Sequence, residues 1–400
     1  MANVSSSNGL EKRPKLRFPG FDESYRTTPL GEIASLVNRT DPKSNAPIMM
    51  LSAGNGFIMQ SEKYSRDNAG QSLKKYILLK QGELAYNHGA SKAKQFGCCY
   101  ELTEPEARIP YVYHCFKIND HEYTPYIAMA LNNAKMDKQL KRLVSSSVRM
   151  DGLLNISFED YMSVTLHLPS STEQKHIADF LKKIDERIAA QEKLLASLKK
   201  YKRGLLMHYF SDDKTQLWTQ CSVSQIGKVL TGSTPPTNDR SNYDGDLLFC
   251  APGDVGEQKY ISSTEKRVSP KGFALGRPLP PNSVIVTCIG LIGKLGIAKT
   301  SMITNQQINA LVVSEGFDHE FIYYAFENFF PEYRSKVSMQ TLPILSKSEF
   351  EKLMIKVPDL DVQHKISSHL AAMDRRIEHT QQELNALIEH RRGIMQQLFI

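Results

Sequence analysis

Two long segments of the chain carry apolar residues at helical spacing. In residues 171–210 and 360–400 these residues follow one another at alternating steps of four and three, the pattern of a coiled-coil seam. Neither Pro nor Gly interrupts the first segment from Thr172 through Arg203, so we predict a long helix there. The predicted seam consists of Ile177, Leu181, Ile184, Ile188, Leu195 and Leu198 in the first segment and Ile366, Leu370, Met373, Ile377, Leu384 and Leu387 in the second.

The second segment repeats the first. Residues 168–210 align with residues 357–399 without a gap, at a constant offset of 189 residues. The polar interruptions of the seam are shared, because Gln191 aligns with Thr380 and Lys202 with Arg391. A polar residue in a seam costs stability but restricts register, so we expect the two helices to pack on each other in one alignment.

The order of elements along the chain determines how such helices can pair. A globular region precedes each helix, so the second helix lies beside the first only if it runs back along it. The predicted pair is therefore antiparallel, and about thirty-five helical residues would separate the globular regions by roughly 50 Å. The alternative is two amphipathic helices, each lying on its own domain.

The globular regions repeat only at their edges. Residues 25–33 align with 218–226 and residues 161–169 with 350–358, whereas residues 85–97 and 285–296 differ. We predict an α+β protein with two β-rich domains, joined by two long antiparallel helices that form a coiled coil, and with an internal pseudo-two-fold repeat. The predicted division is a flexible extension at 1–15, a first domain at 16–170, a spacer helix at 171–210, a second domain at 211–359 and a second spacer helix at 360–400.

Composition narrows the class of protein. Of the 400 residues, 41% are hydrophobic and 23% charged, which is typical of a globular protein. The net charge of +7 suits a polyanionic partner, but many proteins that bind nothing charged share it. No apolar stretch is long enough to span a bilayer and no signal peptide is recognisable, so we expect a cytoplasmic protein without membrane contact.

Catalytic motifs are missing from the sequence. The stretch that ends in Gly293 and Lys294 approaches a phosphate-binding loop, but that loop needs Gly in place of Cys288 and Ser or Thr in place of Leu295. The patterns H-E-x-x-H, G-x-S-x-G and G-x-G-x-x-G do not occur, and the six cysteines include no C-x-x-C pair. We therefore predict a non-catalytic protein that itself binds no metal and no cofactor.

Several short segments resemble one protein family. They are residues 16–21 (LRFPGF), 232–235 (GSTP), 292–294 (IGK), 304–306 (TNQ), Arg149 with 152–156 (GLLNI), and the Pro-x4-Gln-x2-Ile pattern that begins at Pro169 and again at Pro358. Over almost its whole length the chain resembles the specificity subunits of type I restriction-modification enzymes. The resemblance implies two target-recognition domains that bind a bipartite, asymmetric site in double-stranded DNA.

The resemblance also implies partners. Methyltransferase subunits, usually two, would methylate adenine, and ATP-dependent restriction subunits would translocate DNA. S-adenosylmethionine, ATP and Mg²⁺ would then be used by those partners and not by this chain. The rival hypothesis is a coiled-coil scaffold that joins two protein-binding modules and never touches DNA.

Candidate DNA contacts follow from the chemistry of recognition, in which Lys and Arg bind phosphates and polar side chains on loops read base edges. In the first domain they are Asn87, His88, Ser91, Lys92 and Lys94 in a polar loop, Lys138, Lys141 and Arg142 on a predicted helix, and Arg149. In the second domain they are Lys294, Asn305, Gln306, Gln340 and Thr341. A solvated hairpin, a wet helix surface and side chains that satisfy buried backbone groups are the alternative explanations.

Overall fold

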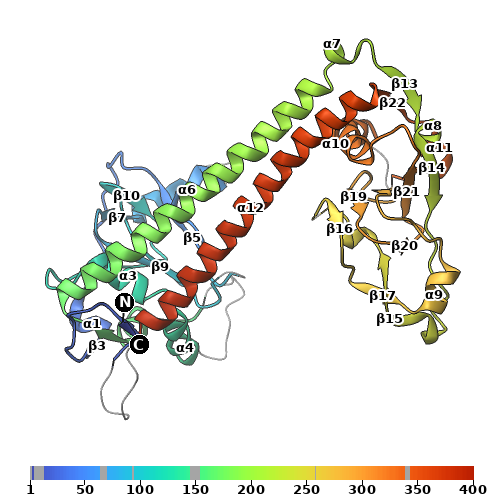
Figure 1. Ribbon diagram of the computed structural model, residues 1–400. Coiled ribbons are helices and arrows are strands. Elements are labelled where there is room, and N and C mark those ends of the chain that lie inside the picture. The colour runs from blue at the N-terminus through green and yellow to red at the C-terminus, as the bar shows by residue number, and fades with distance from the viewer. Residues whose placement is uncertain are drawn as a thin grey trace. The chain divides into compact units, whose positions relative to one another are not determined.

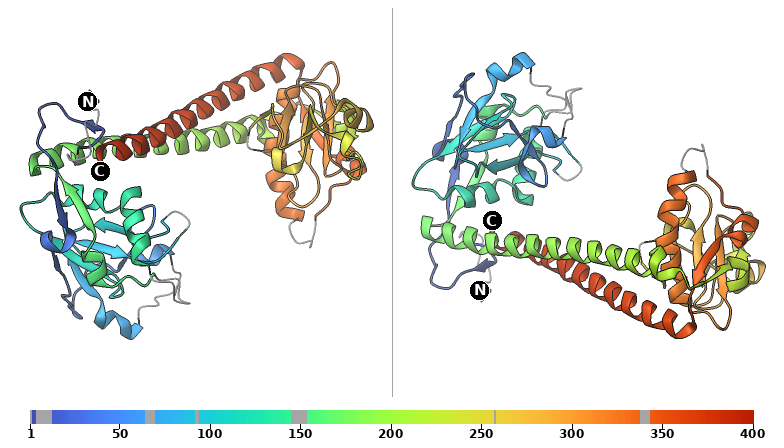
Figure 2. Two further views of the ribbon diagram at one scale, coloured as in Figure 1. Left: turned by 90° about the horizontal axis from the view of Figure 1, so that it is seen from below. Right: turned by 90° about the horizontal axis from the view of Figure 1, so that it is seen from above.

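The computed structural model describes residues 2–3, 13–63, 70–91, 94–144, 154–256, 258–337 and 343–400 (Figures 1 and 2). The chain divides into two compact units. Unit 1 comprises Met1–Gln191 and Glu383–Ile400, and unit 2 comprises Glu192–Gln382. Each unit therefore contains one globular region and a part of both long helices.

Unit 1 begins with short strands and a small helix and ends its globular part on the strand that leads into the first long helix. Its strands are β1 (Ala2–Asn3), β2 (Leu16–Arg17), β3 (Arg26–Pro29), β4 (Ala34–Leu36), β5 (Met49–Ser52), β6 (Gly56–Met59), β7 (Ile77–Lys80), β8 (Leu84–Asn87), β9 (Cys98–Glu101), β10 (Glu106–Ile109), β11 (His114–Ile118) and β12 (Thr165–Leu168). Its helices are α1 (Leu30–Ile33), α2 (Gln60–Lys63), the 3-10 helix η1 (Gly70–Lys75), α3 (Thr124–Ala130), α4 (Ala134–Leu143) and α5 (Phe158–Met162).

Unit 2 has the same kind of layout with a larger sheet. Its strands are β13 (Thr219–Ser222), β14 (Gly227–Thr231), β15 (Tyr243–Cys250), β16 (Tyr260–Ile261), β17 (Lys266–Val268), β18 (Val284–Thr287), β19 (Leu295–Ala298), β20 (Met302–Thr304), β21 (Ile308–Val313) and β22 (Met354–Val357). Its helices are α7 (Asp212–Thr215), α8 (Val223–Ile226), the 3-10 helices η2 (Arg240–Asn242) and η3 (Pro252–Asp254), α9 (Pro270–Leu275), α10 (His319–Val337) and α11 (Lys347–Lys352).

The two long helices, α6 (Ser171–Tyr209) and α12 (Leu360–Leu398), run antiparallel (Figure 1). Polar contacts join them in order along their length. In unit 1 they are Arg391 to Asp185, at 2.9 Å, and Gln191 to Glu383, at 2.7 Å. In unit 2 they are Lys202 to Asp374, at 2.7 Å, and Tyr209 to His369, at 2.5 Å. The residue number rises along α6 as it falls along α12, so the predicted antiparallel pairing is confirmed.

The apolar seam predicted from the sequence lies toward the interior of the units. Eight of its members are buried: Ile177, Leu181, Leu195, Leu198, Ile366, Leu370, Met373 and Leu384. The other four, Ile184, Ile188, Ile377 and Leu387, are half-buried. Of the polar seam positions, Thr380 is buried and donates its hydroxyl hydrogen bond to the carbonyl of Arg376. The helices are thus amphipathic, as the spacing predicted.

Each unit has a central sheet with the same strand order. In unit 1 the order is β4-β11-β8-β9, and in unit 2 it is β14-β21-β18-β19 with β16 added at one edge. One helix packs on each sheet, α3 through Tyr126 and Ile127 and α10 through Phe321 and Ile322. The repeat therefore extends through the interiors, although their sequences differ. The predicted mixed α and β architecture is confirmed.

Matched contacts relate the two units. Gln174 accepts a hydrogen bond from the backbone of Tyr123, and its repeat mate Gln363 accepts one from the backbone of Asp318. The rings of Phe399 and Phe210, which are also repeat mates, contact Tyr126 and Phe321. Both comparisons relate α3 to α10 by the same offset of 195 residues. The pseudo-two-fold repeat is therefore visible in side-chain contacts as well as in topology.

Helix composition gives one further observation. Within the ranges that the structure describes, every helix is either too short or too polar to cross a membrane.

Candidate nucleic-acid interface

In unit 2, four segments meet at one edge of the central sheet, which we call the loop edge of unit 2. They are residues 232–236, 288–294, 305–307 and 343–345. The backbone of Gly232 donates to the carbonyl of Ile308 at 3.0 Å, and that of Cys288 to the carbonyl of Gln307 at 2.9 Å. Leu345 in turn donates to the carbonyl of Cys288 at 2.8 Å. The segments with the sequences GSTP, IGK and TNQ are therefore neighbours in space.

Two glycines explain why the loop edge has this shape. A Cβ on Gly232 would lie 2.1 Å from the carbonyl oxygen of Asn305, so only glycine permits this approach of two backbones. Gly293 has φ +77° and would place a Cβ 2.5 Å from the ring of Phe330. The hydroxyl of Thr287 closes the hairpin by donating to the carbonyl of Leu291 at 2.6 Å. These residues fix the backbone of the turn, so the side chains around it can vary without changing its shape.

The candidate contacts of the second domain take different places on this edge. Gln306 is exposed, and its amide oxygen accepts a hydrogen bond from the hydroxyl of Thr234 at 2.6 Å. Asn305 is half-buried and bonds to both the backbone and the side chain of Gln307. Lys294 is half-buried beside them on the β18–β19 hairpin. Gln306 is thus the most exposed of these three candidates, while Asn305 shapes the turn.

Sequence reasoning missed the apolar members of the loop edge. The side chains of Leu291 and Ile344 are 59% and 53% exposed. Apolar groups at such a site suit contact with the methyl group of thymine. Thr234 was also missed as an individual residue, although the GSTP segment pointed to its turn. In the sequence, the signal for Leu291 is its place in a short turn segment that begins at Gly290 and ends at Gly293.

Unit 1 has an equivalent loop edge, formed by the β8–β9 hairpin and its neighbours. The backbone of Val37 donates to the carbonyl of Cys115 at 2.8 Å, which matches the bond of Gly232 in unit 2. The backbone of Leu154 donates to the carbonyl of His88 at 2.9 Å, which matches the bond of Leu345. The side chain of Tyr111 on this edge is 51% exposed. Both units therefore present loops of different sequence on one backbone frame.

The polar loop of unit 1 divides into exposed and enclosed residues. Ser91 is exposed and Asn87 is half-buried, with its side chain accepting from the backbone of Gly89 at 2.9 Å. The ammonium of Lys94 donates to the carbonyl of Asn132 at 2.9 Å. His88 is only 8% exposed, and both of its ring nitrogens lie against backbone carbonyl oxygens, at 2.8 and 2.9 Å, so neither is left for a base. The structure therefore gives His88 a place in the interior.

The other basic candidates of unit 1 lie on α4. Lys138, Lys141 and Arg142 are all exposed. Asn133 caps the helix by accepting from two backbone amides of its first turn. Exposed Lys and Arg on one helix are suited to phosphates, and the structure leaves them available for that. Four further candidates, Lys92, Arg149, Gln340 and Thr341, lie outside the described residues.

The thiols near the loop edges are not reactive groups. Burial raises the pKa of Cys98 and of Cys288 to about 11. Such thiols stay protonated at neutral pH and behave as small apolar residues. Burial also lowers the pKa of His114, which lies next to His88 in unit 1. These groups are shielded from solvent and serve packing.

Residues 216–390 match the family model of the type I restriction modification DNA specificity domain. This part of the chain is therefore similar to that domain family. The resemblance found in the sequence is therefore confirmed, and the specificity domain includes the loop edge of unit 2 and most of α12.

Curated relatives agree with this assignment. The type I restriction enzyme MjaIX specificity subunit of Methanocaldococcus jannaschii is 30% identical over 178 residues, which are 43% of this chain and 41% of the relative. The HindI specificity subunit of Haemophilus influenzae is 28% identical over 108 residues, 26% of this chain and 24% of the relative. The matched stretches span less than half the length of either curated relative.

Solved structures resemble the chain over nearly its whole length. The S subunit of a type I restriction-modification system from M. genitalium has a TM-score of 0.63 at 14% identity, covering 97% of this chain and 99% of that one. A chain from a study of assembly and conformational transition in a type I system has a TM-score of 0.58 at 16% identity, covering 94% and 97%. At these identities the likeness shows the fold alone.

Proposed function

We propose that this chain recognises a bipartite, asymmetric site in double-stranded DNA for a type I restriction-modification complex. One observation carries the proposal. Equivalent loop edges occur on both units with the same backbone hydrogen bonds, yet they carry different side chains. Two equivalent frames suit two half-sites of a duplex, and different side chains on them suit half-sites of different sequence.

The chemistry of the loop edges supports direct reading of bases. Gln306 offers an amide group, which pairs with adenine edges, and Lys294 offers a donor for guanine. The exposed apolar side chain of Leu291 suits a thymine methyl group. The exposed Lys141 and Arg142 on α4 suit phosphates, which fix position without reading sequence.

The proposal assigns catalysis to partner subunits. Methyltransferase subunits, two of them by the resemblance, would bind S-adenosylmethionine and methylate adenine in each half-site. Restriction subunits would use ATP and Mg²⁺ and act only in complexes that contain them. This chain would hold those subunits on the site and do no chemistry itself.

The test is DNA binding by the chain together with its methyltransferase partner. We expect specific binding that weakens steeply as salt increases, because neutralised phosphates release counterions. Methylated adenines mapped in cells that carry both proteins should lie at two half-sites a fixed distance apart. Binding that ignores salt, or no binding with the partner present, would favour the scaffold that binds only proteins.

A pair of variants tests the loop edge of unit 2. We expect Gln306→Ala to relax or change the base preference of one half-site, with a loss of about 1–3 kcal/mol for the preferred sequence. Gln220→Ala is the matched control, because Gln220 is an exposed glutamine on β13, in a different sheet. If both variants leave the preferred sequence unchanged, Gln306 does not read a base.

A further inference from the structure

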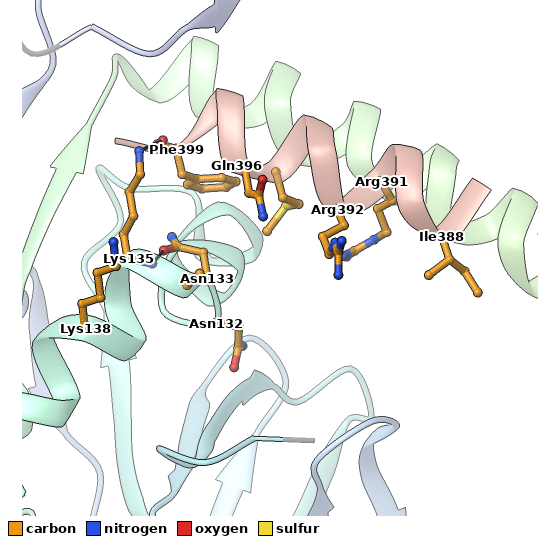
Figure 3. Close-up of a pocket in the computed structure, with 11 residues that line it drawn as sticks. Asn132, Asn133, Lys135, Lys138, Ile388, Arg391, Arg392, Gln396 and Phe399 are labelled. Carbon is orange, nitrogen blue, oxygen red and sulfur yellow. Dashed lines mark hydrogen bonds between the residues drawn. The ribbon is translucent and has the colours of Figure 1, made fainter. Parts of the chain in front are cut away.

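Unit 1 contains a basic cleft that the repeat does not duplicate. Figure 3 shows it between the start of α4 and the last turns of α12, with Lys135 and Lys138 on one side and Arg391 and Arg392 on the other. The cleft has a volume of about 600 Å³. Four of its eleven lining residues are basic, and no acidic residue is among them.

At the equivalent place in unit 2 the cation is enclosed by carboxylates. There Lys202, the repeat mate of Arg391, is held by Glu327 and Asp374 at 2.8 and 2.7 Å. The offset between α3 and α10 places Asn132 of unit 1 where Glu327 stands, so the second carboxylate is missing. Within the described residues, Arg391 forms its ion pair with Asp185, the mate of Asp374. Among the described residues, the cation of unit 1 therefore has one carboxylate partner, whereas the cation of unit 2 has two.

Packing differs in the same place. Phe330 and Leu206 are buried in unit 2, and the residues that align with them in unit 1 are Lys135 and Met395. The helix also differs, because α10 is continuous whereas α3 ends at Ala130 and α4 begins at Ala134. A cation and a half-buried methionine thus replace two core residues, which leaves open space in unit 1.

The cleft combines charge with an apolar floor. Ile388 is 42% exposed, and Met395 and Phe399 lie beside it along the same face of α12. The ammonium of Lys135 donates to the carbonyl of Phe399 at 2.7 Å, while Lys138 has no ion pair within the described part of the chain. Burial and the charges of Lys15 and Lys138 lower the pKa of Lys135. The cations here repel one another and gain from an anionic neighbour.

We propose that this cleft binds a short acidic segment of a partner protein that also carries apolar side chains. Carboxylates of the segment would pair with Lys138 and Lys135 and would compete with the exposed carboxylate of Glu389 for Arg392, and an apolar side chain would cover Ile388 and Met395. A site that the repeat does not duplicate suits a partner segment bound once per chain. The two loop edges, in contrast, are duplicated.

Duplex DNA fits the cleft less well. Its phosphates can meet the basic rim, but its backbone offers nothing to cover an apolar floor. A volume of about 600 Å³ also matches sites that enclose a small ligand or a few side chains. An extended peptide supplies both charge and apolar contact in that space.

The experiment uses the full chain and three fluorescein-labelled ten-residue peptides. The first peptide alternates Asp and Glu with Leu. The second has Ser in place of each Leu, and the third has Asn and Gln in place of Asp and Glu. We expect the acidic peptide with Leu to bind with a stoichiometry of one per chain, and the other two to bind at least tenfold more weakly. Fluorescence anisotropy measures all three, and a duplex competitor tests whether DNA takes the same place.

Charge reversals locate the site. Lys138→Glu or Arg392→Glu should weaken the acidic peptide at least tenfold. Lys141→Glu on the same helix and Arg203→Glu, the unit 2 mate of Arg392, should leave it unchanged, because neither residue lines the cleft. Circular dichroism identifies any variant that fails to fold.

Several outcomes would overturn the proposal. They are an acidic peptide that binds no better than its neutral match, equal losses in all four variants, and displacement by duplex DNA at lower concentration than by unlabelled peptide. The inference does not depend on base reading. A chain that binds its DNA site but no peptide refutes the cleft alone.

Discussion

Lys202 is the residue whose replacement tests the energetics of the helix pair most sharply. Its side chain is 12% exposed and lies between Glu327 and Asp374, whose side chains are 31% and 23% exposed. The change to Met keeps the apolar stem and removes the charge. Two enclosed carboxylates would then face each other without the ammonium group of Lys202 between them.

The expected cost follows from burial. Removal of one partner from a buried ion pair costs about 3–5 kcal/mol, and the partial exposure of these carboxylates reduces that to roughly 2–4 kcal/mol. The matched control is Arg391→Met, since Arg391 is the repeat mate of Lys202. Its partner Asp185 has a side chain 42% exposed, so that change costs about 0–1 kcal/mol.

The assay is urea unfolding followed by the fluorescence of Trp218. This residue is the single tryptophan of the chain and packs on Phe210 and Phe321 in unit 2. With a slope of about 2–3 kcal/mol per molar urea, the midpoint for Lys202→Met should fall by roughly 1 M. Arg391→Met should leave the Trp218 transition nearly where it was.

The dependence on pH gives a second readout. Burial raises the pKa of Glu327, and Lys202 partly offsets this. Without Lys202 the pKa in the folded protein rises further above its unfolded value. Such a group stabilises the fold below its unfolded pKa and loses that contribution as pH rises through the folded pKa. The deficit of Lys202→Met should therefore shrink as the pH is lowered from 7.5 to 5.

Equal shifts of the urea midpoint for Lys202→Met and Arg391→Met would refute this reasoning. The burial of the ion pair would then not determine how much stability is lost when its cation is removed. A deficit that grows at low pH would refute the role given to Glu327.

Three further predictions follow from the fold. Gly232→Ala forces a Cβ against the carbonyl of Asn305 and should destabilise unit 2 by about 1–3 kcal/mol in the same urea assay, whereas Gly253→Ala, with open space around it, should not. Gly204→Ala and Gly393→Ala lie in helix interiors with no heavy atom within 4 Å of the new Cβ, so each should raise stability by about 0.5–1 kcal/mol, measured by thermal unfolding. Insertion of whole helical turns at matched places in α6 and α12 should lengthen the gap between methylated adenines without changing their flanking bases, and altered bases at an unchanged gap would contradict the spacer role.

The long helices could be predicted because their signals are local. The steps of four and three, the lack of Pro or Gly before Gly204, and the gapless repeat all lie in consecutive residues. The antiparallel direction followed from chain order. Burial of Ile177, Leu181, Ile366 and Leu370 agrees with that spacing.

The candidate contacts were harder to predict, because exposure depends on residues far away in sequence. His88 resembles any polar loop residue until Val112 and Leu154 bring carbonyls to both of its ring nitrogens. Asn305 and Gln306 are adjacent in sequence, yet one shapes the turn and the other is exposed. No local pattern distinguishes them.

The sequence by itself determined the repeat, the helices and the similarity of the two halves, because each depends on spacing along the chain. Only the tertiary structure decided which loops share an edge and where the halves differ. Asn132 and Glu327 show the reason. They correspond only once α3 and α10 are superposed through Phe399 and Phe210, and their difference leaves unit 1 with an open basic cleft where unit 2 has a closed ion pair.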